Sequence, residues 1–67
     1  MQMQEMDKWL GKIVIITFIN PENQKETEKC KITDIGDVYI EVRVFNNPKR
    51  EVDVIFPDDI LMVEEVN

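Results

Sequence analysis

Apolar and polar residues alternate in short runs from Lys12 onward, and turn-forming residues separate these runs. A period of two places successive side chains on opposite faces of an extended strand, so the pattern predicts strands. Turns are indicated at 20–23, 36–37 and 46–49, and Pro57 ends a run because proline cannot donate to a strand ladder. The predicted strands are 12–19, 26–34, 38–45, 51–56 and 60–63.

The same alternation predicts which side chains face inward. Cys30 and Ile32 alternate with outward polar residues, and Cys30 is expected to be a small buried hydrophobe. The rest of the predicted core is Ile13, Ile15, Val38, Ile40, Val42, Val44, Val52, Val54, Phe56, Ile60 and Met62. This choice leaves a surplus of large apolar side chains, namely Val14, Ile16, Phe18, Tyr39, Phe45, Ile55, Leu61 and Val63.

Met3, Met6 and Leu10 recur at helical spacing before the first strand, and Gly11 suits a helix terminus. The sequence therefore predicts a short amphipathic helix over 3–10, which must dock because so short a helix is unstable alone. Five strands of this length bury too little as a two-layer sandwich. We expect one mainly β domain over 1–67, with a strongly bent, five-stranded small barrel over 12–63.

Composition excludes several classes of function. The chain has 67 residues, one cysteine and no histidine, so we expect no internal disulfide and no zinc site, and a cytoplasmic location. The amino terminus lacks a basic leader, and the longest apolar run, 13–19, is far too short to cross a bilayer. No nucleophile motif or glycine-rich phosphate loop is present. We predict no enzyme activity, no catalytic residue, no cofactor and no metal.

The net charge of −6 is concentrated at one end of the sequence. Residues 1–50 carry eight acidic and eight basic side chains, whereas residues 51–67 carry six acidic ones and no lysine or arginine. Binding to a phosphate backbone requires clustered cations. The carboxyl-terminal segment is therefore expected to repel nucleic acid.

The run WLGKIVIITF, followed later by VIFPDDILMV, resembles the two signatures of Sm-like proteins, and the resemblance covers roughly residues 3–65. It extends to the Sm-like domain of some bacterial ribosome-maturation factors and, more distantly, to Hfq. The resemblance implies a small barrel of Sm-like (Src-homology-3-like) type, which commonly binds RNA through two turns. Here the first turn, 35–39, lacks the family's asparagine, and Asp58 and Asp59 stand where the family has Arg-Gly or Lys-His.

Acidic side chains therefore occupy the turns that bind RNA in the family. Around a ring, Asp34, Asp37, Asp58 and Asp59 are expected to converge on one acidic face, which repels phosphate. For Asp58 and Asp59 two interpretations stay open, namely capping of a short helical turn and service as paired carboxylates or ligands of a hard cation.

The surplus of apolar residues predicts self-association. The last two strands are expected to be free edges, and unpaired edges invite the addition of another strand. In Sm-like rings strand four of one subunit pairs with strand five of the next, which implies a homo-oligomer of five to seven subunits. The interface residues predicted on this basis are Val54, Ile55, Ile60, Leu61, Met62 and Val63.

Three functions remain open from the sequence. The first is an oligomeric interaction module whose acidic face recruits a basic protein segment or a cation. The second is RNA binding through another surface, with possible weak contacts from Lys29, Lys31, Lys49 and Arg50 and base stacking on Tyr39. The third is an inhibitor of phage type that mimics nucleic acid by presenting carboxylates. The basic residues also suit a solvated turn, and Tyr39 also suits a half-buried strand position.

Overall fold

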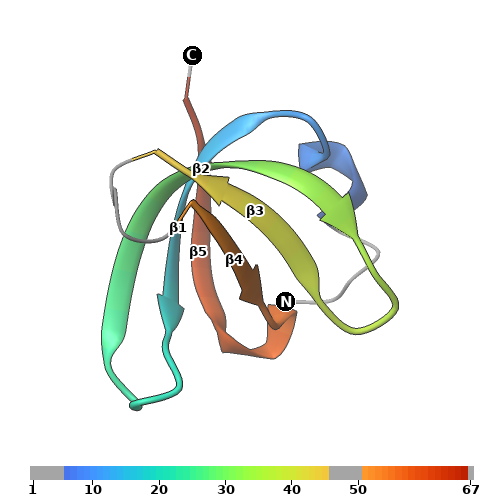
Figure 1. Ribbon diagram of the computed structural model, residues 1–67. Coiled ribbons are helices and arrows are strands. Elements are labelled where there is room, and N and C mark those ends of the chain that lie inside the picture. Colours follow the sequence, from blue (N-terminus) through green and yellow to red (C-terminus); the bar gives the residue numbers. More distant parts are fainter. Residues whose placement is uncertain (1–5, 46–50, 67) are drawn as a thin grey trace.

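The computed structural model describes residues 6–45 and 51–66. Within these ranges the chain forms five β-strands and two short 3₁₀ turns (Figure 1). In chain order the elements are η1 (Asp7–Trp9), β1 (Ile13–Ile19), β2 (Lys25–Ile35), β3 (Ile40–Val44), β4 (Val52–Ile55), η2 (Pro57–Asp59) and β5 (Ile60–Glu65). The prediction of a mainly β chain with five strands is confirmed.

The five strands form one antiparallel sheet in the order β4-β3-β2-β1-β5. β4 and β5 are its two edges, as the sequence predicted, and no ladder joins them in the described part of the chain. The strongly bent, five-stranded small barrel predicted from the sequence is present as a curled, open sheet that does not close (Figure 1). η2 begins at Pro57, whose ring nitrogen cannot donate to a ladder, so β4 ends before it can meet β5.

β2 causes much of the curvature. Its first part, Lys25–Lys31, pairs with β1, and its second part, from Cys30 to Ile35, pairs with β3. Among the described residues of β2, Cys30 and Lys31 are the two with ladder partners on both sides. The strand therefore passes from one half of the sheet to the other, and the register shift between Ile32 and Asp34 adds a bulge, which increases twist and bending.

The core lies on the inner face of the curled sheet. Its buried apolar residues are Met6, Val14, Ile16, Phe18, Cys30, Ile32, Ile40, Val42, Val44, Ile55 and Ile60. The inward faces predicted for β2 and β3 are confirmed. On β1 the prediction is wrong, because Val14, Ile16 and Phe18 are buried whereas Ile13 is exposed. Both faces of this strand are apolar, so the alternation alone does not select one.

The inward face predicted for β4 is also wrong. Ile55 is opposite the buried Ile40, and residues directly opposite in an antiparallel ladder share a face. Ile55 is therefore buried, and Val52, Val54 and Phe56 are exposed. Val38 and Met62 are further predicted core residues that the structure exposes.

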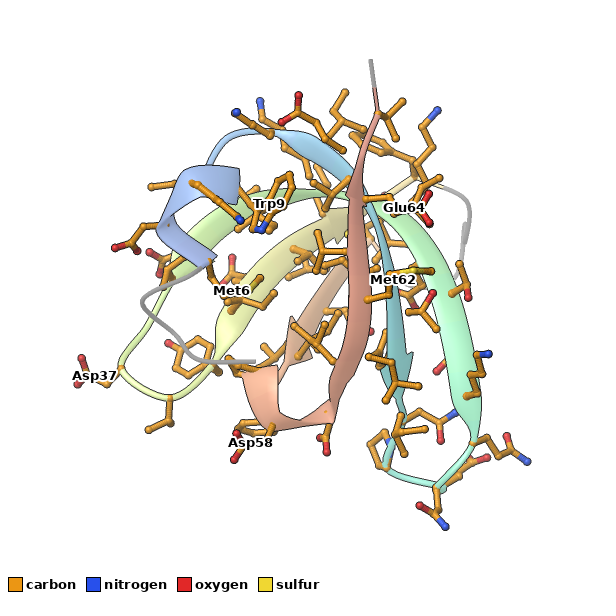
Figure 2. The ribbon with its side chains drawn as sticks, turned by 180° about the vertical axis from the view of Figure 1, so that it is seen from behind. Met6, Trp9, Asp37, Asp58, Met62 and Glu64 are labelled. Atoms are coloured by element: carbon orange, nitrogen blue, oxygen red, sulfur yellow. The ribbon has the colours of Figure 1, made fainter. Side chains whose placement is uncertain are left out.

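A single 3₁₀ turn, η1, stands where the sequence predicts a helix over 3–10; residues 3–5 lie outside the described ranges. The predicted docking does occur, since Met6 is fully buried and Trp9 packs against the core (Figure 2). Gly11 ends the segment with a φ of 80° and donates its N–H to the Ile32 carbonyl at 2.8 Å. A left-handed residue stops the turn here, so the segment does not continue as a helix toward β1.

Candidate functional site

Three turns lie along the lower side of the molecule as drawn, with η2 in the middle and the β1–β2 and β2–β3 turns at opposite edges (Figures 1 and 2). Their exposed acidic residues are Glu22, Asp37, Asp58 and Asp59, which we call the acidic end. Residues 20–24, 36–39 and 56–59, which make up these turns, include no lysine or arginine. The end therefore has carboxylates from three separate segments and no cation within those segments.

The acidic end differs from the predicted acidic face by two residues. Asp37 and Asp58 both point outward at this end in Figure 2. Asp34 instead lies on β2, where its ladder partner is Glu41. Glu22 was not predicted and belongs to the acidic end through the β1–β2 turn; its only signal in the sequence was its position in a turn between two strands.

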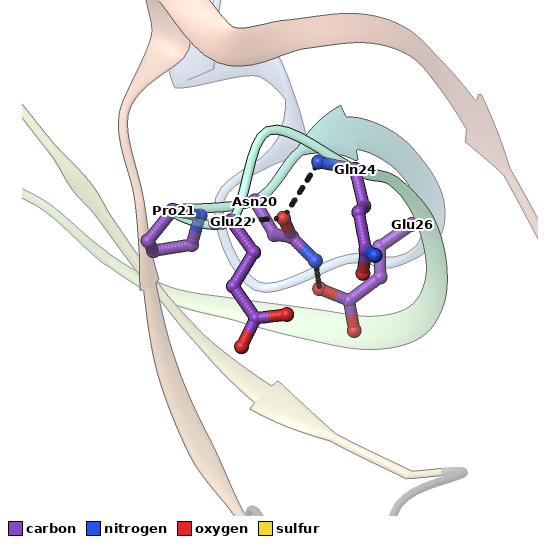
Figure 3. Close-up of a pocket in the computed structure, with 5 residues that line it drawn as sticks. All are labelled: Asn20, Pro21, Glu22, Gln24 and Glu26. Carbon is purple, nitrogen blue, oxygen red and sulfur yellow. Dashed lines mark hydrogen bonds between the residues drawn. The ribbon is translucent and has the colours of Figure 1, made fainter.

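The β1–β2 turn is held rigidly by Asn20. Its side-chain Oδ1 accepts hydrogen bonds from the backbone N–H groups of Glu22 at 3.0 Å and Gln24 at 2.8 Å, and its Nδ2 donates to Glu26 Oε2 at 3.1 Å (Figure 3). Asn23 adopts a left-handed φ of 63°, which asparagine tolerates better than most residues. An open hollow of about 440 Å³ is lined by Asn20, Pro21, Glu22, Gln24 and Glu26. The hydrogen bonds of Asn20 therefore fix the backbone conformation at Glu22.

η2 places Asp58 and Asp59 beside each other in a single 3₁₀ turn. The predicted short helical turn is present, but the predicted capping is wrong, because neither carboxylate forms a side-chain cap. The backbone N–H of Asp59 donates instead to the Phe56 carbonyl at 2.9 Å. Both side chains are exposed, so their charges face solvent.

An apolar groove opens beside η2. Its volume is about 100 Å³, and it is lined by Phe18, Ile19, Pro21, Asp53, Val54, Ile55, Phe56 and Asp59. Phe18 and Ile55 are core residues, whereas Pro21, Val54 and Phe56 are exposed. The groove therefore leads from the surface of the acidic end toward the core, between the end of β1 and the edge strand β4.

Tyr39 lies in the β2–β3 turn, directly before β3. It is half-buried, and its carbonyl accepts a hydrogen bond from the N–H of Gly36 at 2.8 Å. The ring packs so closely over Gly36 that a methyl group there would lie 2.8 Å from Tyr39 Cε1. One face of the ring is thus occupied by the turn, which disfavours stacking of a base on that face.

Two of the four predicted basic contacts are described by the structure. Lys29 and Lys31 are exposed on β2, and Lys49 and Arg50 lie outside the described residues. Lys31 is directly opposite the exposed Arg43 of β3, which the sequence analysis missed because the strand register is needed to find it. Like charges in such a pair repel, so an anion between them is favourable.

Two carboxylates that are buried or partly buried, those of Glu28 and Asp53, influence the thiol of Cys30. Glu28 is only 4% exposed, and Asp53 is partly buried on β4. Burial, followed by the negative charges of Glu28 and Asp53, raises the pKa of the Cys30 thiol from 9.0 to about 12. The thiol therefore stays protonated at neutral pH and is a poor nucleophile.

The predicted interface residues on the two edge strands divide into two groups. Ile55 and Ile60 are 2% and 6% exposed, so their side chains already belong to the core of their own chain. Val54, Leu61 and Met62 are about half exposed, at 47%, 57% and 48%, and Val63 is half-buried. Only the second group has apolar surface to offer to a neighbouring molecule.

No family model, no curated protein and no solved structure matches this chain. The resemblance to Sm-like proteins therefore stays a prediction. In the described residues, no group of three acidic or cysteine side chains is arranged to hold a metal ion. Those residues also contain no helix of the length and apolarity that crossing a bilayer requires.

Proposed function

We propose that this chain is a non-enzymatic, Sm-like interaction module that associates with copies of itself and uses the acidic end to bind a basic segment of another protein. The acidic end supports the proposal most strongly. Three segments far apart in the sequence place exposed carboxylates along one side of the molecule, with η2 between the other two turns, and these turns contain no cation. Such a charge distribution attracts cationic ligands and increases their rate of association.

Charge also favours a protein partner over RNA at this end. A phosphate backbone gains most of its affinity from lysine and arginine, which release its counterions. Glu22, Asp58 and Asp59 would repel that backbone. The same carboxylates would attract a lysine-rich or arginine-rich protein segment.

Self-association is supported by the two edge strands. β4 and β5 each have an unpaired edge in the described chain, and the apolar residues Val54 and Leu61 are exposed on them. Pairing β4 of one copy with β5 of the next would satisfy both edges and cover Leu61. Because the two edges differ, the contact is heterologous and closes into a ring when the rotation permits.

The binding test uses a lysine-rich peptide, a glutamate-rich peptide of equal length and a single-stranded RNA, each followed by fluorescence anisotropy over a range of salt concentrations. We expect only the lysine-rich peptide to bind, with an affinity that falls as salt rises. The double variant Asp37→Asn/Asp58→Asn should weaken this binding. The control Asp7→Asn/Glu64→Gln removes the same charge from exposed sites elsewhere and should weaken it less. RNA binding to the acidic end would refute the proposal.

The assembly test is native mass spectrometry at micromolar concentration. We expect species larger than a monomer, which Leu61→Lys should dissociate by placing a charge on the β5 edge. Val38→Lys introduces the same charge at an exposed site in the β2–β3 turn and should leave the assembly intact. A monomer at every concentration would rule out assembly.

A second candidate is RNA binding by the outer face of β2 and β3, and the pairing of Lys31 with Arg43 favours it. Together with Lys29, these residues form a small exposed row of cations. In the same RNA titration, binding that weakens steeply with salt and is lost in Lys31→Glu would support this candidate.

A further inference from the structure

We propose that the groove beside η2 receives one apolar side chain of a basic protein segment, while cations next to that side chain meet the carboxylates at the groove rim. This inference rests on the proposed function and names the sequence class of its partner. The groove selects a segment in which a residue such as leucine or methionine lies between lysines or arginines. Charge alone would not require that central residue.

The size of the groove points to a single side chain. Pockets for small ligands commonly enclose about 300–1,000 Å³. The volume here is about 100 Å³, which leaves space for one aliphatic side chain and not for a nucleotide or a drug-sized molecule. A macromolecular partner that inserts one residue and lays its backbone outside fits this volume.

The groove is lined by buried apolar residues at its base and by exposed apolar residues at its rim. Phe18 and Ile55 form part of the core, so they are fixed by packing. Pro21, Val54 and Phe56 are exposed in the free chain, and an inserted side chain would remove some of their surface from water. Exposed apolar surface beside a preformed depression is a common feature of protein interaction sites.

Acidic residues give the groove its preference for cations. Asp59 lines it directly, Asp58 precedes Asp59 in η2, and Glu22 follows the lining residue Pro21. None of the lining residues is basic. A segment with an apolar side chain between cations can therefore place that side chain in the groove and its cations beside the carboxylates. An acidic segment with the same apolar residue is repelled.

A second copy of the chain is a weaker occupant. Its best matching segment in the described residues is the exposed Leu10, which lies between Lys8 and Lys12. Both of these cations already have partners, because Lys12 Nζ is 3.1 Å from Glu65 Oε1 and Lys8 Nζ lies 5.0 Å from the centre of the Trp9 ring. Docking this segment into another copy would compete with those contacts.

The test compares two capped pentapeptides. One has leucine between two pairs of lysines, and the other has glycine in place of the leucine. Each is titrated into the ¹⁵N-labelled chain, and binding is followed by two-dimensional NMR. We expect the leucine peptide to bind about tenfold more tightly, as partial burial of one leucine side chain implies. Shift changes should centre on the amides of Ile19, Val54, Phe56 and Asp59.

Matched variants separate the groove from general electrostatics. Phe56→Ala removes a groove wall, and Phe45→Ala removes an aromatic side chain that is equally exposed, at 50% against 51%, but does not line the groove. Phe56→Ala should reduce the preference for leucine to about twofold or less, and Phe45→Ala should leave it unchanged. The spectrum of each variant reports whether it is folded.

The possible failures can be told apart. If both peptides bind equally and Phe56→Ala has no effect, the groove inference is overturned and the proposed function stands. If neither peptide binds, both are overturned. If the groove amides shift with protein concentration alone, and Leu10→Ala abolishes that shift, the occupant is a second copy and the inference of a separate partner is overturned.

Discussion

The ring of Tyr39 packs over the backbone of Gly36 so closely that no larger residue fits there without a shift of the ring. Gly36→Ala should therefore destabilise the fold by about 1–2 kcal/mol through overpacking. In a Tyr39→Ala background the same substitution should be neutral or slightly stabilising, because the added methyl group has space and alanine restricts the unfolded chain. Urea denaturation of the four proteins in this double-mutant cycle measures the difference.

Asn20 should be the most sensitive position in the β1–β2 turn. Asn20→Ala removes the three hydrogen bonds to Glu22, Gln24 and Glu26 and should lower the free energy of unfolding by about 1–2 kcal/mol. Asn20→Asp keeps the two acceptor contacts but places a carboxylate against Glu26 in place of a donor. Repulsion between the two carboxylates should therefore make Asn20→Asp less stable than the unmodified chain, and Glu26→Gln should relieve that repulsion. Thermal unfolding of the two single variants and of Asn20→Asp/Glu26→Gln tests both expectations.

Cys30 should make the fold less stable in alkaline solution. Its pKa is about 12 in the folded chain against 9.0 for an unperturbed thiol, so between these values the unfolded chain has lost the proton and the folded chain retains it. The unfolded state then binds fewer protons, and stability falls as pH rises from about 9, by at most about 1.4 kcal/mol per pH unit. Below pH 9 the thiol contributes no pH dependence.

The matched control for this prediction is Cys30→Val, which fills a similar volume and does not titrate. The difference in unfolding free energy between the two proteins should be constant from pH 7 to 8.5 and should then move in favour of the valine variant. A constant difference up to pH 10.5 would contradict the prediction. A native thiol that reacts slowly with an alkylating reagent at pH 8 would agree with it.

Met6 should contribute far more to stability than its place before the first strand suggests. It is fully buried, so Met6→Ala should lower the free energy of unfolding by about 2–5 kcal/mol. Leu10→Ala, four residues later, truncates a side chain that is 52% exposed and should change it by no more than about 0.5 kcal/mol. Denaturant titration of the two variants would show the contrast, and equal effects would contradict the docking of the segment that contains Met6.

The existence and approximate bounds of the strands could be predicted because alternation and turn residues are local signals. The inward faces of β2 and β3 followed from the same signal, since charged residues mark their outer faces. β1 and β4 could not be assigned in this way. β1 is apolar on both faces, and the three apolar residues Val52, Val54 and Phe56 outnumber the single Ile55 that the structure buries. The face of β4 is decided by its register with β3, which is not a local property.

The site was predictable in part for the same reason. The acidic character of the turns could be read directly from the sequence, whereas the convergence of Asp37, Asp58 and Asp59 on one face around a ring stays a prediction. Glu22 and Arg43 were missed because their significance depends on which strands and turns are neighbours. The groove depends on the curl of the sheet, which brings the end of β1 toward β4, and no run of residues indicates it.

Because β2 pairs with β1 along one part and with β3 along the other, we expect the two halves of the sheet to unfold cooperatively. Cys30 and Lys31 pair with β1 on one side and with β3 on the other. Unfolding of either hairpin would therefore remove ladder partners that position β2 for the other hairpin. The chain should therefore open as a whole rather than by halves, and the amide protons at this crossing should exchange with solvent only when everything else does.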